Sequence, residues 1–191
     1  MILNKDLANH LANITSNAAI ACYPYIGKKN KDLADKVATD KMRENLNSLN
    51  IDGEVVIGEG ELDEAPMLFI GEKLGNGNGP SIDIAVDPVE GTNFAARNLP
   101  GALSVLATSI KGNLFKAPET YMEKISTKVK EKNVVDLDYS IKKNIYNLSE
   151  YLNKKPENLT ACLLDRPRHN EIINSLKQLK VKIKLITDGD V

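Results

Sequence analysis

The chain of 191 residues carries 25 lysines and arginines against 26 aspartates and glutamates, so its formal net charge is −1. This balance excludes a general attraction to nucleic acid or to a membrane surface. With 42% hydrophobic and 27% charged residues, the composition is typical of a globular protein and not of a disordered chain. No apolar run approaches the roughly 20 residues of a membrane span. The N-terminal sequence shows no apolar segment of a signal peptide, so we expect a cytoplasmic protein.

The first half of the chain predicts two helices followed by strands. Apolar side chains at helical spacing, and then short apolar runs between glycines, predict helices at 4–25 and 32–49 and strands at 54–57, 67–70 and 81–86. We expect Asp87-Pro88 to end the last of these strands, because proline lacks the amide that a strand ladder uses.

The second half alternates strands and helices. Its predicted elements are a turn into a short helix at 90–97, strands at 102–109 and 114–117, a helix at 138–152, a strand at 159–164, a helix at 169–179 and a strand at 181–186. The last strand–helix–strand unit indicates parallel strands with a right-handed crossover. We therefore predict an α/β (α+β) protein built in layers.

The near-zero net charge hides an acidic window. Residues 52–90 carry ten carboxylates and one base, a net charge of −9, and the rest of the chain carries +8. A solvated acidic surface is one interpretation. Many of these acids, however, stand among glycines and apolar residues, and carboxylates beside buried strands must be paired or hold a cation.

The segment at 87–92, DPVEGT, carries the most informative part of this window. It follows a buried strand, where open α/β sheets place their ligands. The Glu90 side chain, three residues after Asp87, can return toward the Asp87 carboxylate. Thr92 offers a hydroxyl at the start of a helix. Hard carboxylates without histidine favour Mg²⁺ or Mn²⁺ together with a phosphate. Glu59 and Glu61, two residues apart, can face one cavity, although an ordinary acidic turn is the alternative.

Two further clusters of charged residues are candidate ligand-binding groups. Arg166 and Arg168 are two of only four arginines, which suggests a planar clamp for an anion. Surface arginines that cap a helix are the alternative. Asp188 and Asp190 follow the last strand and suit a metal, sugar hydroxyls or a plain surface turn.

The remaining reactive residue types give weaker signals. Cys22 and Cys162 lie far apart without a CxxC motif, so we expect both to be reduced and buried. His10 and His169 are isolated, which gives zinc little support. No Walker A motif is present, which disfavours a P-loop NTPase.

Taken together, these segments resemble class II fructose-1,6-bisphosphatase. The matching blocks run in the family's order: VIGEGE at 56–61 with DEAPM at 63–67, DIAVDPVEGT at 83–92, AP at 117–118 with YM at 121–122, RPRH at 166–169 and DGDV at 188–191. The resemblance implies the α-β-α-β-α sandwich of the metal-dependent, lithium-sensitive phosphatases. It also implies gluconeogenic hydrolysis of fructose 1,6-bisphosphate to fructose 6-phosphate with Mn²⁺ or Mg²⁺ at a two-metal site.

The resemblance assigns roles residue by residue. It makes Asp35 and Glu59 ligands of one metal and Asp87 and Glu90 ligands of a second. It makes Thr92 and Glu61 catalytic, with Thr92 helping to orient the attacking water. The implied substrate-contacting positions, whose arginines would hold the distal phosphate, are Glu90, Gly91, Thr92, Tyr121, Arg166, Pro167, Arg168, Asp188, Gly189 and Asp190.

Two features depart from the family pattern. The loop at 27–32 reads GKKNKD where the family has Gly-x-Gly-Asp-Lys-Asn, so Lys29 stands in place of a glycine and Asn30 in place of an aspartate. Lys36 follows Asp35 where the family usually has a small residue.

Family members are also longer than this chain. We therefore expect a C-terminally truncated form, with residues 1–160 as an N-terminal phosphatase domain carrying the metal site and 161–191 as the start of a second half.

Three hypotheses follow from the resemblance. The first is a truncated fructose-1,6-bisphosphatase, weakly active or inactive by itself, whose intact relatives form homo-oligomers and can also act on sedoheptulose 1,7-bisphosphate. The second is a catalytically impaired fragment that retains metal or sugar-phosphate binding. The third is a related phosphatase acting on another sugar or inositol phosphate, against which the arginine clamp and the 188–190 segment argue.

Overall fold

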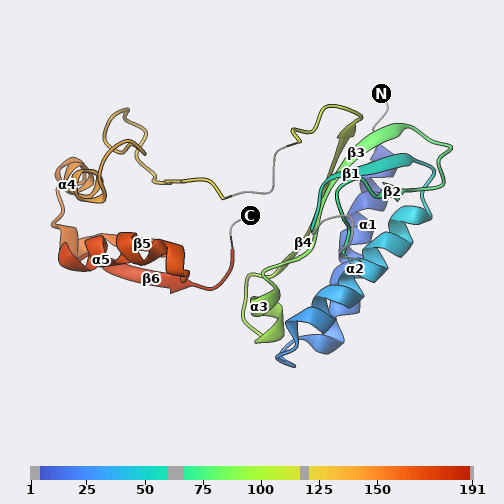
Figure 1. The fold of residues 1–191 in the computed structure, drawn as a ribbon, viewed down its shortest axis with the longest axis horizontal. Coiled ribbons are helices and arrows are strands. Elements are labelled where there is room, and N and C mark those ends of the chain that lie inside the picture. Colours follow the sequence, from blue (N-terminus) through green and yellow to red (C-terminus); the bar gives the residue numbers. More distant parts are fainter. Residues whose placement is uncertain (1–4, 60–66, 117–120, 190–191) are drawn as a thin grey trace. The chain divides into compact units, whose positions relative to one another are not determined.

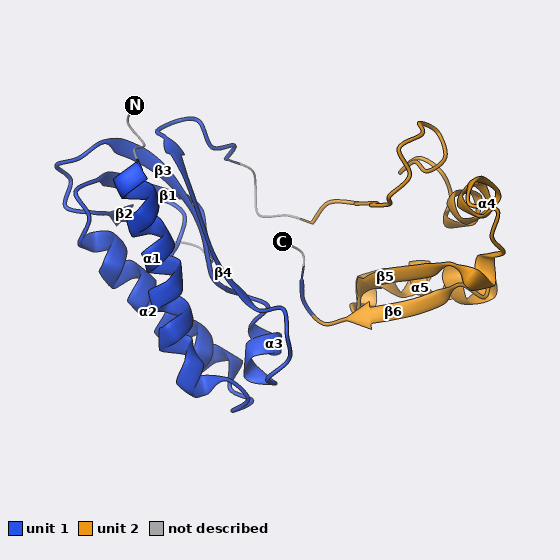
Figure 2. Ribbon diagram, turned by 180° about the vertical axis from the view of Figure 1, so that it is seen from behind, with its two compact units in different colours: residues 1–118, 188–191 blue, residues 119–187 orange. Residues whose placement is uncertain are grey.

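The computed structural model describes residues 5–59, 67–116 and 121–189. The chain divides into two compact units, residues 1–118 with 188–191 and residues 119–187 (Figure 2). The division expected at residue 160 refers to the halves of the complete fold and stays a prediction. Within the described ranges, no helix has both the length and the apolar composition of a membrane span.

Unit 1 combines two long helices with a four-stranded sheet (Figure 1). Its elements are α1 (Lys5–Cys22), η1 (Tyr23–Tyr25), α2 (Lys31–Asn47), β1 (Asp52–Ile57), β2 (Lys73–Leu74), β3 (Ser81–Glu90), α3 (Thr92–Ala96) and β4 (Leu103–Ile110). The strand order is β2-β1-β3-β4, with β1 and β3 parallel and the other pairs antiparallel. The helices predicted at 4–25 and 32–49 are thus confirmed, with ends shifted by a few residues.

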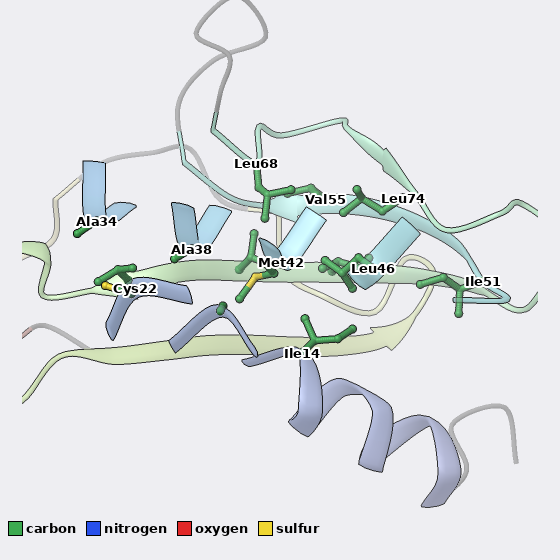
Figure 3. Packing of buried hydrophobic residues seen from close by; sticks show 14 of the residues in the cluster. Ile14, Cys22, Ala34, Ala38, Met42, Leu46, Ile51, Val55, Leu68 and Leu74 are labelled. Atoms are coloured by element: carbon green, nitrogen blue, oxygen red, sulfur yellow. The ribbon is translucent and has the colours of Figure 1, made fainter. Parts of the chain in front are cut away.

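The core of unit 1 lies between the two long helices and the sheet (Figure 3). On α2, buried side chains recur every fourth residue, which places them on one face of the helix. They are Ala34, Ala38, Met42 and Leu46, each fully buried. Ile82 and Ile84 of β3 are also fully buried in this cluster. The apolar spacing that predicted this helix therefore also fixes which of its faces meets the sheet.

The strand predicted to stop at residue 86 continues to Glu90, so this expectation was wrong. The reason lies in its neighbours. Strand β1 pairs with β3 only as far as Ala85, so the missing amide of Pro88 removes no ladder bond on that side. On the other side, the pairing with β4 shifts register between Asp87 and Glu90. A register shift of this kind re-aims side chains, and here it falls on both predicted ligands.

Residues 67–70 do not form the predicted strand either. The chain still runs beside β1, held by irregular backbone bonds. The Gly71 amide donates to the Val55 carbonyl at 2.7 Å, and the Val55 amide donates to the Glu72 carbonyl at 3.0 Å. Residues 114–116 of the strand predicted at 114–117 are also irregular, and residue 117 lies outside the described residues.

Unit 2 contains α4 (Ile141–Tyr151), η2 (Pro156–Asn158), β5 (Thr160–Leu164), η3 (Pro167–His169), α5 (Asn170–Gln178) and β6 (Lys182–Ile186). Strands β5 and β6 pair in parallel, which confirms the predicted strand–helix–strand unit. The α+β class is therefore confirmed. Both cysteines are free as expected, but Cys162 is exposed and only Cys22 is buried, because the outward side of β5 is not covered within this unit.

Candidate active site

Helix α2 delivers the first predicted ligand, Asp35. The helix begins where the Asn30 side chain accepts a hydrogen bond from the Leu33 amide at 3.0 Å. Asp35 follows one turn later and is only 7% exposed. In the described part of the chain no donor reaches its Oδ1 atom. Burial, reinforced by the charge of Asp32 and opposed by Lys31, raises the Asp35 pKa from 3.8 to about 6.

Glu59 follows the end of β1, and it lines one cavity together with Asp35. Its amide donates to the Leu68 carbonyl at 3.0 Å. Gly58 permits this approach, because a Cβ there would overlap the same carbonyl oxygen. The cavity has a volume of about 160 Å³, and the Oε2 atom of Glu59 is buried. Its lining residues are Lys31, Asp32, Asp35, Glu59, Met67 and Thr92.

Asp87 and Glu90 bring two more carboxyl groups from the end of β3. Glu90 is 8% exposed, and no partner within the described ranges reaches Asp87 Oδ1. Burial, the hydrogen bond with Glu90 and the charges of Glu90 and Asp35 together raise the Asp87 pKa to about 7, although a backbone hydrogen bond from Val89 opposes the rise. The sequence predicted that Glu90 returns toward Asp87, and this contact is present. The carboxyl groups of α2 and β3 therefore lie close enough to influence each other.

These groups fit a hard divalent cation in their chemistry. They offer carboxylate oxygens alone, the ligands that Mg²⁺ and Mn²⁺ prefer. The buried Oδ1 atoms of Asp35 and Asp87, which no donor from the described residues reaches, are atoms that a cation would satisfy. As placed, however, no three His, Cys, Asp or Glu side chains among the described residues converge tightly enough to hold an ion. Binding would thus require side-chain rearrangement.

Gly91 forms the turn between β3 and α3. Its backbone is left-handed, with φ of 78°, and its carbonyl accepts the Phe94 amide at 2.8 Å. Thr92 opens α3, as the sequence predicted, and it also lies at the wall of the cavity that Asp35 and Glu59 line. On the next residue, the Asn93 side chain donates to Asp188 Oδ1 at 3.2 Å. The predicted residue Asp188 therefore contacts the same short helix.

The altered loop at 27–32 packs against the end of α3. The Gly27 amide donates to the Ala95 carbonyl at 3.0 Å, and the Lys29 amide donates to the Ala96 carbonyl at 2.8 Å. Lys29 adopts a left-handed backbone with φ of 59°, a conformation that favours glycine. The loop thus keeps a glycine-type backbone although Lys29 stands in the glycine position.

In unit 2 the two arginines of the predicted phosphate clamp have different partners. The Arg166 guanidinium donates to the Thr187 carbonyl at 2.6 Å and to the Asp165 carbonyl at 3.0 Å. Arg168, in contrast, lies over the ring of Tyr121, with its Cζ atom 3.9 Å from the ring centroid. The structure therefore brings two predicted substrate residues together and gives Arg166 backbone partners. Pro167 begins η3, and Gly189 has a left-handed backbone.

Two predicted residues, Glu61 and Asp190, lie outside the described residues. Sequence reasoning also missed a group beside the cavity. Arg43 of α2 forms an ion pair with Glu72 at 2.6 Å and donates to the Met67 carbonyl at 2.5 Å. The available signal was the scarcity of arginine, since Arg43 is one of only four.

Comparison with protein families settles the relationship that these residues suggest. The model of the family described as "Bacterial fructose-1,6-bisphosphatase, glpX-encoded" matches residues 5–191. The chain belongs to this family. Among glpX-type proteins, the "D-fructose 1,6-bisphosphatase class 2/sedoheptulose 1,7-bisphosphatase" of Synechococcus sp. (strain CC9902) is 46% identical over 189 residues. The "Fructose-1,6-bisphosphatase 1 class 2" of Escherichia coli (strain K12) is 44% identical over the same length.

The chain does not cover the full length of these glpX-type relatives. The alignments include 99% of this chain but only 57% of the Synechococcus protein and 56% of the Escherichia coli protein. Among solved structures, an extragenic suppressor from Pyrococcus furiosus matches 56% of this chain and 41% of its own, at 18% identity and a TM-score of 0.38. That similarity is too low to bear on function.

Proposed function

We propose that this chain serves the metal-dependent hydrolysis of fructose 1,6-bisphosphate to fructose 6-phosphate and phosphate, in the cytoplasm. The observation that carries the proposal is the meeting of acidic groups from three elements. Asp35 of α2 and Glu59 after β1 line one cavity with Thr92, and Asp87 at the end of β3 lies close enough to sense the Asp35 charge. The names of the relatives support fructose bisphosphate, and the two free cysteines fit a reducing compartment.

The four carboxylates would hold two divalent cations, Mn²⁺ or Mg²⁺. Asp35 and Glu59 would hold one, and Asp87 with Glu90 the other. Bound cations of this kind lower the pKa of water and neutralise phosphoryl oxygens. The Thr92 hydroxyl, at the wall of the cavity, would orient the attacking water. Glu61 is assigned a catalytic role on the resemblance.

The substrate's distal phosphate would bind Arg168. Its guanidinium lies against the Tyr121 ring, which holds the planar group in one orientation. Arg166 would support this loop through its bonds to backbone carbonyls rather than contact phosphate with its whole guanidinium. Asp188, held by Asn93, would accept hydrogen bonds from sugar hydroxyls, together with Gly189 and Asp190. A remote phosphate anchor of this kind positions the reacting phosphate.

The test begins with binding and then measures catalysis. Mn²⁺ is titrated into the 191-residue chain by calorimetry, and phosphate release from fructose 1,6-bisphosphate is followed with Mn²⁺ present. We expect Mn²⁺ binding that Glu59→Gln weakens at least about tenfold. Glu44→Gln, which removes an exposed carboxylate of α2, is the matched control and should leave binding unchanged.

The outcomes separate the three hypotheses. Phosphate release that depends on Mn²⁺ and on Glu59 would support the proposed reaction. Binding of Mn²⁺ and sugar bisphosphate without release would support a fragment that binds but does not catalyse. Faster release from an inositol phosphate than from fructose 1,6-bisphosphate would support the related phosphatase. Absence of Mn²⁺ binding would refute the metal site.

A further inference from the structure

Arg43 connects helix α2 to residues 67–72, the segment that returns beside β1 and is called the returning segment below. Its Nε atom donates to Glu72 Oε1 at 2.6 Å, and its Nη2 atom donates to Glu72 Oε2 at 3.2 Å. The same Nη2 atom donates to the Met67 carbonyl at 2.5 Å. The side chains of Arg43 and Glu72 are only 24% and 12% exposed, so this contact is shielded from water. A bidentate arginine contact of this kind fixes both distance and orientation.

The returning segment in turn holds the backbone of Glu59. Met67 lines the carboxylate cavity, and the next residue, Leu68, is fully buried and accepts the Glu59 amide at 3.0 Å. Two hydrogen bonds, joined by the peptide bond between residues 67 and 68, therefore lead from the Arg43 guanidinium to the Glu59 backbone. Residues 67–70 form no regular strand, and the backbone bonds to Val55 of β1 are made further along, by Gly71 and Glu72.

Arg43 and Asp35 belong to one rigid element. They are eight residues apart on α2, which corresponds to about 12 Å along a helix and to little more than two turns. Helix α2 thus places Asp35 in the cavity wall. Through Arg43 it also holds residues 67–68, which bind the backbone of Glu59. Displacement of the returning segment would move Glu59 while Asp35 stayed in place.

We infer that Arg43 is a positioning residue that sets the placement of Glu59 relative to Asp35 and so tunes the affinity of their shared cation site. The inference rests on the proposed function, which makes these two carboxylates ligands. Arg43 is not one of the residues that line the cavity and is not one of the proposed ligands. Lysine would keep the charge but not the planar fork that serves Glu72 and Met67 together.

The test uses Arg43→Lys and Arg43→Met in the 191-residue chain. Calorimetric titration with Mn²⁺ should give a dissociation constant about 10-fold higher for Arg43→Lys and up to about 100-fold higher for Arg43→Met. Lys41→Gln, which breaks an exposed ion pair with Glu44 on the same helix, is the control and should leave the constant unchanged. Thermal melts of the metal-free variants separate affinity from stability. A lowered melting temperature with unchanged Mn²⁺ affinity in the folded chain would overturn the inference.

A second readout does not depend on metal. Hydrogen exchange of the Glu59 amide should be faster in Arg43→Lys than in the wild type, while exchange in the central strand β3 stays the same. Equal exchange at Glu59 would overturn the inference even if Mn²⁺ affinity fell. If the wild-type chain bound no Mn²⁺, the proposed function would fail. Faster exchange at Glu59 would then still support positioning of its backbone by Arg43.

Discussion

Replacing Asp35 by asparagine should stabilise the metal-free protein at neutral pH. Asparagine keeps the shape of the side chain but carries no charge to bury. In the folded chain the Asp35 pKa is about 6 against 3.8 ordinarily, so folding favours the protonated form. The stability that Asp35 contributes is therefore complete below pH 3.8 and is lost as the pH rises through 6.

The magnitude follows from the two pKa values. At about 1.36 kcal/mol for each pH unit, the interval from 3.8 to about 6 corresponds to about 3 kcal/mol of lost stability at pH 8. At pH 4 Asp35 is protonated in most folded molecules, and the loss of stability is only about 0.5 kcal/mol. Asp35→Asn should therefore be more stable than wild type by up to about 3 kcal/mol at pH 8 and by about 0.5 kcal/mol at pH 4.

The assay is urea unfolding in the presence of EDTA at both pH values. Glu44→Gln, on the same helix but exposed, should change the unfolding free energy by less than about 1 kcal/mol. Adding Mn²⁺ at 100 times its dissociation constant should stabilise the wild type by about 2.7 kcal/mol and Asp35→Asn by much less. Equal stability of Asp35→Asn and wild type at pH 8, or an equal gain at both pH values, would refute the reasoning.

Lys29→Gly should raise the unfolding free energy by about 0.5–1 kcal/mol, because it relieves a left-handed lysine; an unchanged melting temperature would contradict this. Gly58→Ala should lower the unfolding free energy by about 1–3 kcal/mol and weaken Mn²⁺ binding, since its Cβ would meet the Leu68 carbonyl; unfolding and titration test both effects. Tyr121→Leu should weaken fructose 1,6-bisphosphate binding by about two- to fivefold through Arg168 and leave Mn²⁺ affinity unchanged, as calorimetry would show.

The parts of the fold that local spacing determines could be predicted. Buried residues every fourth position on α2, from Ala34 to Leu46, fix both the helix and its inner face. The sequence also predicted that Asp87 follows a buried strand, where open α/β sheets place their ligands, but the parallel pairing of β1 with β3 came only from the structure. The position of Asp35 in that site came from family resemblance, since a lone aspartate on a helix carries no such signal.

The features that depend on distant partners could not be predicted. Pro88 ends a strand only if its amide is needed, and that depends on where β1 stops along β3. Residues 67–70 have the composition of a strand, but their backbone is held by Arg43, 24 residues before Met67 in sequence. No local pattern records contacts across such a separation, and this is also why Arg43 was not recognised as part of the site.

The buried carboxyl groups of Asp35 and Asp87, each with an Oδ1 atom that no donor in the described part of the chain reaches, also bear on how this sequence can change. A neutral residue in place of Asp35 or Asp87 would remove a buried charge and make the folded chain more stable. If the site had no function, such substitutions would raise the stability of the fold without impairing activity, and selection would not remove them. Both aspartates are present. Their presence, at a cost in stability, fits the cation site proposed above.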